Sequence, residues 1–324
     1  MKSFYTLLQR EYWENRGSFA ITPIGIGCFF VIALIFVLFG SESFMSDANR
    51  EMGNFSNIRI NGLNISGFDF FSDMTKEFAL VPLEQRIDVW TIALYSLSAM
   101  FMVVLVFVSV FYLLGALYDD RRDRSILFWK SLPVSDLMTV TSKVAVVFFV
   151  LPIMFIAAIF VTFLAIMLIA TVVAWFGGGH AWASIWEPAP FLSVPLKILM
   201  AHIIHTMWAA PVIGWLLFVS SWTKRKPILV ATIPLGAIAF LEGYYNRSSH
   251  FATSVWERLL GWLTPIEISS GQHLGSGNNV QDYWNIYGQA PSLLSTNEMW
   301  VGLLIGAALF AGAVMIRRYR DESL

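Results

Sequence analysis

Long stretches of apolar residues alternate along the chain with short segments in which the charged residues gather. Six stretches contain no Asp, Glu, Lys or Arg: 17–41, 89–118, 144–186, 198–223, 227–241 and 299–316. Most of them reach the ~18–20 residues that an α-helix needs to cross ~30 Å of hydrocarbon. The pattern therefore predicts an all-α membrane protein with six transmembrane helices.

The composition supports this prediction. Of the 324 residues, 57% are hydrophobic and 13% are charged, whereas about 25% of the residues in soluble globular domains are charged. The net charge of −1 gives no support for nucleic-acid binding. Cys28 is the single cysteine, so one chain can form neither a disulfide nor a metal site built from cysteines.

The basic residues favour an orientation with both termini in the cytoplasm, because cytoplasmic flanks retain Lys and Arg. With the N-terminus inside, the inner segments hold 14 of the 21 Lys and Arg residues, and the longer outer segments hold six. A single transmembrane domain in the plasma membrane, the inner membrane of a bacterium, is expected. Its spans are predicted at about 18–40, 90–118, 143–174, 197–222, 227–245 and 299–316, with external loops at 41–89 and 246–298.

The third uncharged stretch is long enough for two spans, but a second crossing would place the basic residues 224–226 outside. We therefore expect one helix to about Ala174, ended by the glycines 177–179. Kinks are expected wherever a proline removes a backbone donor within a span. The prolines concerned are Pro152, Pro211 and Pro234.

Residues 2–16 precede the first span and can form an amphipathic helix along the inner membrane surface. The apolar face would hold Phe4, Leu7, Leu8 and Tyr12, and the opposite face Thr6, Gln9 and Arg10. Glu11 lies near the apolar face, where it would either pair with a basic group or weaken that face. Arg16 ends the segment. Simple anchoring of the chain is the alternative role for this interfacial helix.

The inner connection between the second and third spans combines dense mixed charge with bulky apolar residues. It reads Asp119-Asp120-Arg121-Arg122-Asp123-Arg124, continues through Phe128 and Trp129, and ends at Pro133. On a helix, Asp119 can pair with Arg122 and Asp120 with Arg124. Such a helix can dock on a soluble partner, because charges orient the docking and aromatic side chains anchor it. A solvated loop that obeys the positive-inside rule is the alternative.

This segment resembles the one after the second helix in permeases of the ABC type-2 transporter family. The residues that carry the resemblance are 119–125, 128–133, Ser135 and Lys143, and the run from Leu7 to Arg16 is similar to the interfacial helix of that family. The six-span pattern extends the resemblance over essentially the whole chain. One departure is that many relatives carry Glu-x-x-Gly-Thr before the Leu-Pro element, where this chain has Arg122-Asp123-Arg124-Ser125.

The resemblance implies the permease subunit of an exporter, driven by a separately encoded ATP-binding-cassette ATPase. The coupling helix would present Asp119, Asp120, Arg121, Arg122, Asp123, Arg124, Phe128 and Trp129 to that ATPase. Two permease chains, a homodimer in preference to a heterodimer, would line the pathway, and re-entrant helices are implied over 251–267. The sequence contains no Gly-x-x-x-x-Gly-Lys-Ser/Thr motif, so no cofactor is expected in this chain, and ATP and Mg²⁺ are expected in the partner.

Ionisable residues within spans are functional candidates because their burial in lipid is costly. His202 and His205 are three residues apart on the fourth span and could bind a metal or relay protons, but no third ligand is visible nearby. Structural histidines are the alternative. Glu242 follows the shortest uncharged stretch, so either the fifth helix continues to about Asn246 or the bilayer is thinner there.

These residues leave the function open at this point. Glu242 and His205 are candidates for the pathway or its gate, and no metal site is expected. The same side chains, with His202, would serve a membrane-embedded enzyme. A non-transporting anchor or sensor, in which the external loops bind a ligand, is a third hypothesis.

Overall fold

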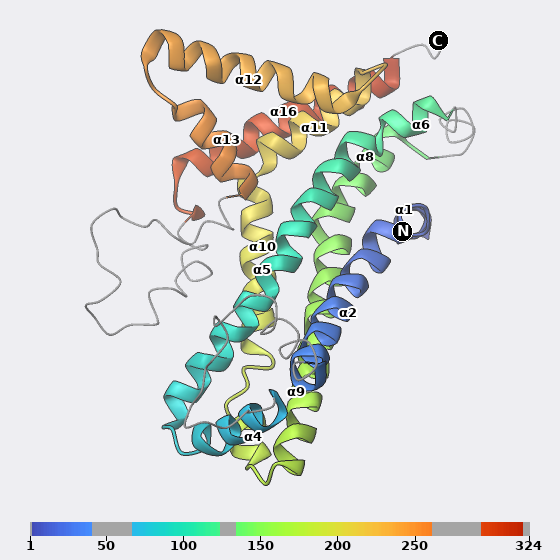
Figure 1. Cartoon of the computed structure of the whole chain (residues 1–324). Coiled ribbons are helices and arrows are strands. Elements are labelled where there is room, and N and C mark those ends of the chain that lie inside the picture. The colour runs from blue at the N-terminus through green and yellow to red at the C-terminus, as the bar shows by residue number, and fades with distance from the viewer. Residues whose placement is uncertain (1, 41–66, 124–133, 261–292, 320–324) are drawn as a thin grey trace, which may run out of the picture. The chain divides into compact units, whose positions relative to one another are not determined.

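The computed structural model describes residues 2–40, 67–123, 134–260 and 293–319, and every element within these ranges is helical (Figure 1). The α-helices are α1 (Lys2–Glu14), α2 (Thr22–Ile35), α4 (Gly67–Phe78), α5 (Leu83–Ala116), α6 (Tyr118–Arg122), α8 (Asp136–Ala145), α9 (Leu151–Phe176), α10 (Ser193–Trp208), α11 (Ala210–Trp222), α12 (Pro227–Asn246), α13 (His250–Leu260) and α16 (Asn297–Tyr319). Short π-helical turns are η1 (Gly17–Ile21), η2 (Phe36–Gly40), η3 (Val146–Val150) and η4 (Trp182–Trp186). The all-α prediction is confirmed for these residues.

Five helical segments of the described chain are long and apolar enough to cross a membrane, and a bent pair of helices would make a sixth. The five are Gly17–Leu38, Leu83–Arg122, Asp136–Phe176, Pro227–Asn246 and Asn297–Tyr319. The second and third segments begin at Leu83 and Asp136, earlier than the expected 90 and 143. The expected bounds follow the uncharged stretches, whereas a helix can also include the charged residues that precede such a stretch. The chain is a helical, multipass membrane protein.

The region expected as the fourth span, 197–222, is covered by α10 and α11, and the chain bends by 61° between them, at the proline where a kink was expected. The bend lies where a proline has no N–H to donate, since Pro211 follows the first residue of α11. The backbone N–H groups of Val212 and Ile213 donate instead to Ala209 O. Arg258 of α13 stabilises the bend, because its NH1 donates to Trp208 O (2.8 Å) and its guanidinium lies 4.3 Å from the Trp208 ring centroid.

The other expected breaks are present to different degrees. Helix α9 is single and ends at Phe176, where the glycines 177–179 begin and Gly178 adopts a φ of 73°. Pro152 is the second residue of α9, which begins at Leu151 directly after the π-helical turn η3, whereas Pro234 lies inside the continuous helix α12. Helix α12 extends to Asn246, as expected in the first of the two readings for Glu242, but the Glu242 side chain is half-exposed, whereas that reading expected it to be buried.

Two segments expected as external loops contain helices. Helix α4 lies within 41–89, and α13 covers the first part of the 251–267 segment for which re-entrant helices are implied. Residues 41–66 and 261–292 lie outside the described residues, as does the rest of that segment.

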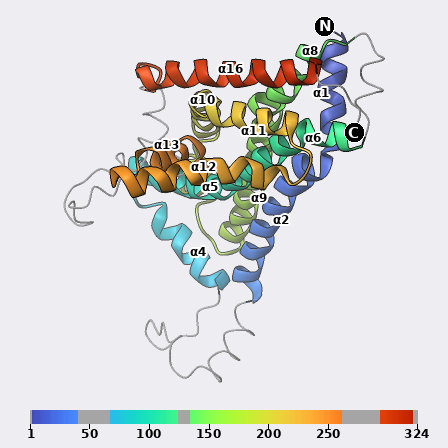
Figure 2. The same ribbon diagram turned by 90° about the horizontal axis from the view of Figure 1, so that it is seen from above.

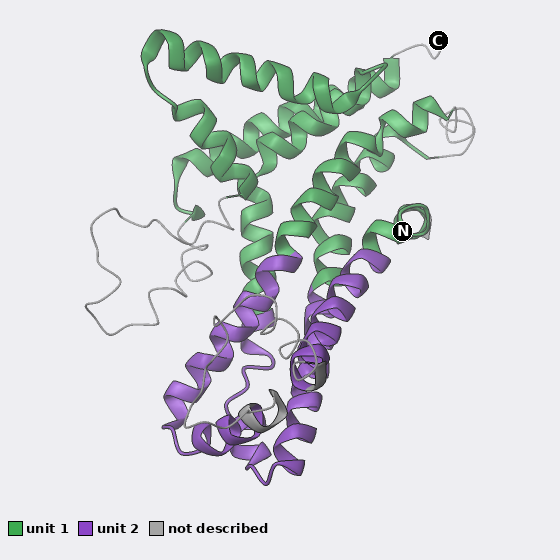
Figure 3. Cartoon of the chain, viewed as in Figure 1, with its two compact units in different colours: residues 1–19, 102–155, 196–324 green, residues 20–101, 156–195 purple. Residues whose placement is uncertain are grey.

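The chain divides into two compact units (Figure 3). Unit 1 comprises residues 1–19, 102–155 and 196–324, and unit 2 comprises 20–101 and 156–195. The division runs within the continuous helices α5 and α9, so each of these helices contributes one end to each unit.

In unit 1, α11 and α16 pack closely through glycines, and Figures 1 and 2 show the two helices running side by side. A Cβ atom on Gly306 would lie 2.6 Å from Ala210 O, and one on Gly214 would lie 2.8 Å from Gly306 O. Only glycine permits backbones to approach this closely, as at the small-residue interfaces of transmembrane helices. The α11·α16 pair is therefore a closely packed helix pair within unit 1.

Unit 2 contains an apolar cavity of about 290 Å³, lined by residues of α2, α4, α5, α9 and η4. Its walls include Leu38, Phe71 and Trp90. Helix α4 is fixed to the end of α9, because Ser72 Oγ donates to Gly177 O at 3.2 Å. A Cβ on Gly177 would collide with the same Ser72 hydroxyl, so the glycine run both ends α9 and admits α4.

Candidate functional site

Helix α1 presents a buried acid on the same face as the apolar side chains that it buries. Leu7 and Glu11 are 4% and 1% exposed, and residues four positions apart lie on one side of a helix. The Glu11 carboxylate accepts hydrogen bonds from Lys143 Nζ (2.9 Å) and from the Tyr112 hydroxyl (2.8 Å). The expectation that Glu11 pairs with a basic group is confirmed.

Arg10 was expected on the polar face of α1, but its side chain is only 12% exposed. Its Nε donates to Glu14 Oε1 (2.6 Å) and its NH2 to Asp120 Oδ1 (3.2 Å). Burial disfavours the charged guanidinium, but the carboxylates of Glu14, Asp120 and Glu11 outweigh this cost and raise the pKa of Arg10 above its usual value. Arg10 therefore joins α1 to α6 as a permanent cation.

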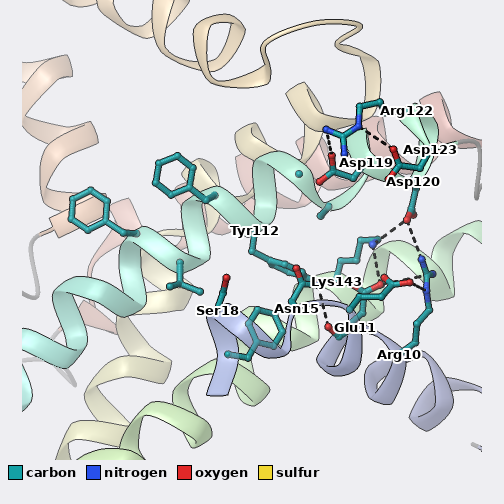
Figure 4. A pocket seen from close by; sticks show the side chains of 17 residues that line it. Arg10, Glu11, Asn15, Ser18, Tyr112, Asp119, Asp120, Arg122, Asp123 and Lys143 are labelled. Atoms are coloured by element: carbon teal, nitrogen blue, oxygen red, sulfur yellow. Dashed lines mark hydrogen bonds and ion pairs between the residues drawn. The ribbon is translucent and has the colours of Figure 1, made fainter. Parts of the chain in front are cut away.

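Asp120 is the centre of these contacts and is only 5% exposed. Besides Arg10, its carboxylate lies 3.6 Å from Lys143 Nζ and 3.2 Å from Arg317 NH1. Arg317 in turn donates from Nε to Asp136 Oδ1 (3.1 Å). Figure 4 shows Lys143 reaching both Glu11 and Asp120. We call Arg10, Glu11, Asp120, Lys143 and Arg317 the buried ion network.

Burying the charges of this network costs free energy, and offsetting that cost requires a specific arrangement of partners around each charge. Removing charges from water costs several kcal/mol per ion, which close pairing and additional hydrogen bonds can offset. In this network each of the two carboxylates has at least two cationic or hydroxyl partners. The three cations gain further compensation from outside it, because Arg10 also pairs with Glu14 and Arg317 with Asp136. The network joins α1, α6, α8 and α16, and Tyr112 adds α5. These five helices of unit 1 are thus tied together at one point.

Arg121, the neighbour of Asp120, makes a second connection. Its NH2 donates to Ser220 O (2.6 Å) and Thr223 O (3.0 Å), carbonyls at the end of α11. In the other direction, the Ser220 hydroxyl accepts from the backbone N–H groups of Leu117 and Tyr118, each at 3.0 Å. Helix ends leave such groups unsatisfied, and a cation near a C-terminus is favoured by the helix dipole. Arg121 is therefore a positioning residue that holds α6 against α11.

Asp119, Arg122 and Asp123 remain on the surface, and we call them the exposed charged trio. Their side chains are 49%, 58% and 61% exposed. Arg122 NH1 lies 3.2 Å from Asp119 Oδ1, which confirms the expected i,i+3 pair, and Arg122 Nε donates to Asp123 Oδ1 at 3.0 Å. Arg124, Phe128 and Trp129, which complete the expected coupling segment, lie outside the described residues.

Comparison of the chain with protein-family models, with curated proteins and with solved structures gives no match. The interpretation of the site therefore rests on its own chemistry. Helix α6 and the residue that follows it, Asp123, carry the exposed charged trio on one side, and the buried Asp120 and half-buried Arg121 lie on the other. A force applied to the trio would be transmitted to the helices tied by the buried ion network.

The other candidate residues lie apart from this network. Glu242 accepts from Ser248 Oγ and from the backbone N–H of Phe251, both at 2.8 Å, and so caps the start of α13. His205 is 8% exposed on α10, and the Nε2 atom of His202 is buried with no hydrogen-bond partner among the residues that the structure describes. Arg16 is exposed. The ranges that the structure covers contain no group of three His, Cys, Asp or Glu able to hold a metal ion.

Sequence reasoning gives no role in the site to four residues that complete it: Tyr112, Asp136, Lys143 and Arg317. Of these, Lys143 is named only among the residues that carry the family resemblance. A usable signal was available, because Glu11 on an apolar helix face demands a cation, and Lys143 and Arg317 stand at the ends of spans. Their partners are 132 and 197 positions away in sequence, so spacing along the chain could not pair them.

Proposed function

We propose that this chain is the membrane-embedded permease subunit of an ABC-type exporter, located in a bacterial inner membrane with both termini in the cytoplasm. A separate ATPase supplies the energy, and a second permease chain, a homodimer in preference to a heterodimer, completes the pathway. The bent pair α10 and α11 counts as one span in this proposal, which gives six.

One observation carries the proposal: the two-sided character of α6. A docking surface for a motor protein needs exposed charges for orientation, and Asp119, Arg122 and Asp123 supply them. The same short helix also has to transmit movement to the membrane helices. Asp120 and Arg121 meet this need, since they contact α1, α8, α11 and α16 through ion pairs and helix-end carbonyls.

Movement would then spread as a rigid-body displacement. Closure of the ATPase would push α6, and the buried ion network would carry the displacement to α5 and α8, the inner ends of the second and third spans. Switching between two packed arrangements of helices is a common means of alternating access. The absence of a phosphate-binding glycine loop from the sequence agrees with an external source of energy.

The test is a charge reversal at the exposed charged trio. We expect Arg122→Glu to lower the amount of ATPase that co-purifies with the chain from its native membrane by about five- to tenfold, because reversing a charge replaces attraction by repulsion across the interface. Quantitative mass spectrometry of the purified complex measures this ratio. The matched control is Arg225→Glu, which reverses an equally exposed basic residue between α11 and α12.

Equal co-purification with both variants would contradict docking through α6. Purification of the unaltered chain with no nucleotide-hydrolysing protein would contradict the whole proposal and would favour the enzyme or sensor hypothesis instead. Loss of an enzymatic activity on His205→Ala, without any requirement for ATP hydrolysis, would select the enzyme.

A further inference from the structure

A cavity of about 750 Å³ opens in unit 1 between the end of α1 and the face of α5 and α6 (Figure 4). It is within the size range of small-molecule sites, roughly 300–1,000 Å³. Its lining changes character along its length, because α5 contributes Phe107, Val108 and Phe111, while α1 and α6 contribute charged residues. A cavity with one apolar end and one charged end fits an amphiphile.

The charged end of the cavity is acidic overall. Its carboxylates are Glu11, Glu14, Asp119, Asp120 and Asp123, and its basic groups are Arg10, Arg122 and Lys143. The five carboxylates and three basic groups give the lining a net charge of −2. An anionic head group would be repelled by this balance and a cationic one attracted.

The mouth of the cavity offers acceptors with spare capacity. Asp119 and Asp123 both pair with Arg122, the one guanidinium that contacts them within the described ranges, and an ionised carboxylate can accept about four hydrogen bonds. Asp119 folds back over Gly115, where a Cβ atom would lie 2.6 Å from Asp119 Oδ2. An ammonium group placed here would face two half-exposed carboxylates.

The apolar end lies toward the middle of the second span. Phe107 and Phe111 are 55% and 59% exposed and are one helical turn apart, so they form a continuous apolar strip on α5. The charged residues begin at Asp119, where the uncharged stretch of this helix ends. The cavity therefore crosses the boundary between hydrocarbon and water, with its apolar end in the hydrocarbon.

We propose that this cavity binds an amphiphile with an ammonium head group and a hydrocarbon tail. The ammonium would lie between Asp119 and Asp123, and the tail along Phe107 and Phe111. An ethanolamine phospholipid of the bilayer and a free alkylammonium compound share this chemistry. The site belongs to unit 1 alone and needs no ATPase, so it stands independently of the transport proposal.

Photolabelling of the full chain in nanodiscs of phosphatidylglycerol tests the site. Three probes carry the same diazirine-labelled hydrocarbon chain: an ethanolamine phospholipid, a glycerol phospholipid and a primary alkylammonium ion. Mass spectrometry measures the labelling of the peptide that contains residues 107–111. We expect at least one ammonium probe to label this peptide about three- to tenfold more than the glycerol probe does, the range typical of a few solvent-accessible ion pairs.

Two variants separate head-group recognition from partition into the bilayer. Asp119→Asn combined with Asp123→Asn should reduce labelling by the ammonium probes to the level of the glycerol probe. Gly115→Ala should do the same without a change of charge, because its Cβ displaces the Asp119 carboxylate. The control is Asp73→Asn on α4, an exposed acid that pairs with Lys76 three residues on, as Asp119 does with Arg122.

The outcomes identify the ligand or remove the proposal. Labelling by the ethanolamine lipid indicates a resident membrane lipid, and labelling by the primary alkylammonium probe alone indicates a free cationic amphiphile. Equal labelling by all three probes, or labelling by the ammonium probes that survives both the aspartate variants and Gly115→Ala, would overturn the proposed site.

Discussion

The two units place a buried cation in opposite kinds of surroundings. In unit 1, Lys143 lies between two carboxylates, and Lys143 and its partner Glu11 are both only 2% exposed. In unit 2, Arg86 is also buried, but it donates mainly to backbone carbonyls, those of Val81 (2.9 Å) and Ala183. Its acidic partner Glu187 is 41% exposed.

This difference decides how each unit responds to the loss of a charge. A backbone carbonyl is neutral, so Arg86 remains bonded when its acid is removed, and water can reach the position of Glu187. In unit 1 the charges compensate one another away from water, and the loss of one leaves another uncompensated. The buried ion network is therefore both more specific and more fragile than the contacts of unit 2.

Lys143→Met should have the largest effect. We expect the free energy of unfolding to fall by about 3–5 kcal/mol, the cost of breaking a buried ion pair by removal of one partner. Glu11 would keep its hydrogen bond from Tyr112 but would lose the ammonium at 2.9 Å. Thermal unfolding in detergent, followed by the fluorescence of the 13 tryptophans, measures the loss.

The double variant Glu11→Gln with Lys143→Met is the control for this prediction. If charge imbalance causes the loss, neutralising Glu11 should restore at least half of it, as a double-mutant cycle would show. An additive effect of the two substitutions would mean that packing, and not the ion pair, dominates.

Glycine-to-alanine substitutions compare the tightness of helix packing in the two units. Gly306→Ala in unit 1 should cost about 1–3 kcal/mol, because its Cβ would meet backbone atoms of Ala210, which cannot move without shifting α11. Gly27→Ala in unit 2 meets the side chain of Thr162, whose rotamer can change. Replacing glycine by alanine stabilises a helix interior by about 1 kcal/mol. This gain should offset the cost of the contact with Thr162, so Gly27→Ala should leave the free energy of unfolding nearly unchanged.

The same unfolding measurement on both variants checks this pair. Similar losses at the two positions would show that unit 2 is packed as rigidly as unit 1.

The helices could be predicted from the sequence far better than the site. Long apolar runs bounded by charges dictate where helices cross a membrane, and the third span ended two residues beyond the expected Ala174. The bend near Pro211 followed from the missing donor. The angle of the bend could not be predicted. It depends on the contact of Arg258 with Trp208, and the sequence does not show where α13 packs.

The separation of Arg121 from Arg122 shows what the sequence could not provide. Both were expected to face a partner protein, yet Arg121 bonds to the end of α11 while Arg122 is exposed. Successive residues on a helix point about 100° apart, since a turn takes 3.6 residues. Which of them faces inward depends on the register of α6 against α11, and that register is fixed by Ser220, 102 positions from Tyr118.

Glu187→Gln should have the smallest effect and is the strictest check of the contrast between the units. The Arg86 side chain would keep its bonds to Val81 O and Ala183 O, and a glutamine oxygen can still accept from it. Because the acid is 41% exposed, solvent screens the pair, and such pairs are worth about 0–1 kcal/mol. We expect a change in unfolding free energy below about 1 kcal/mol. A loss as large as that of Lys143→Met would mean that unit 2 also depends on a compensated buried charge, and the two units would then be stabilised in the same way.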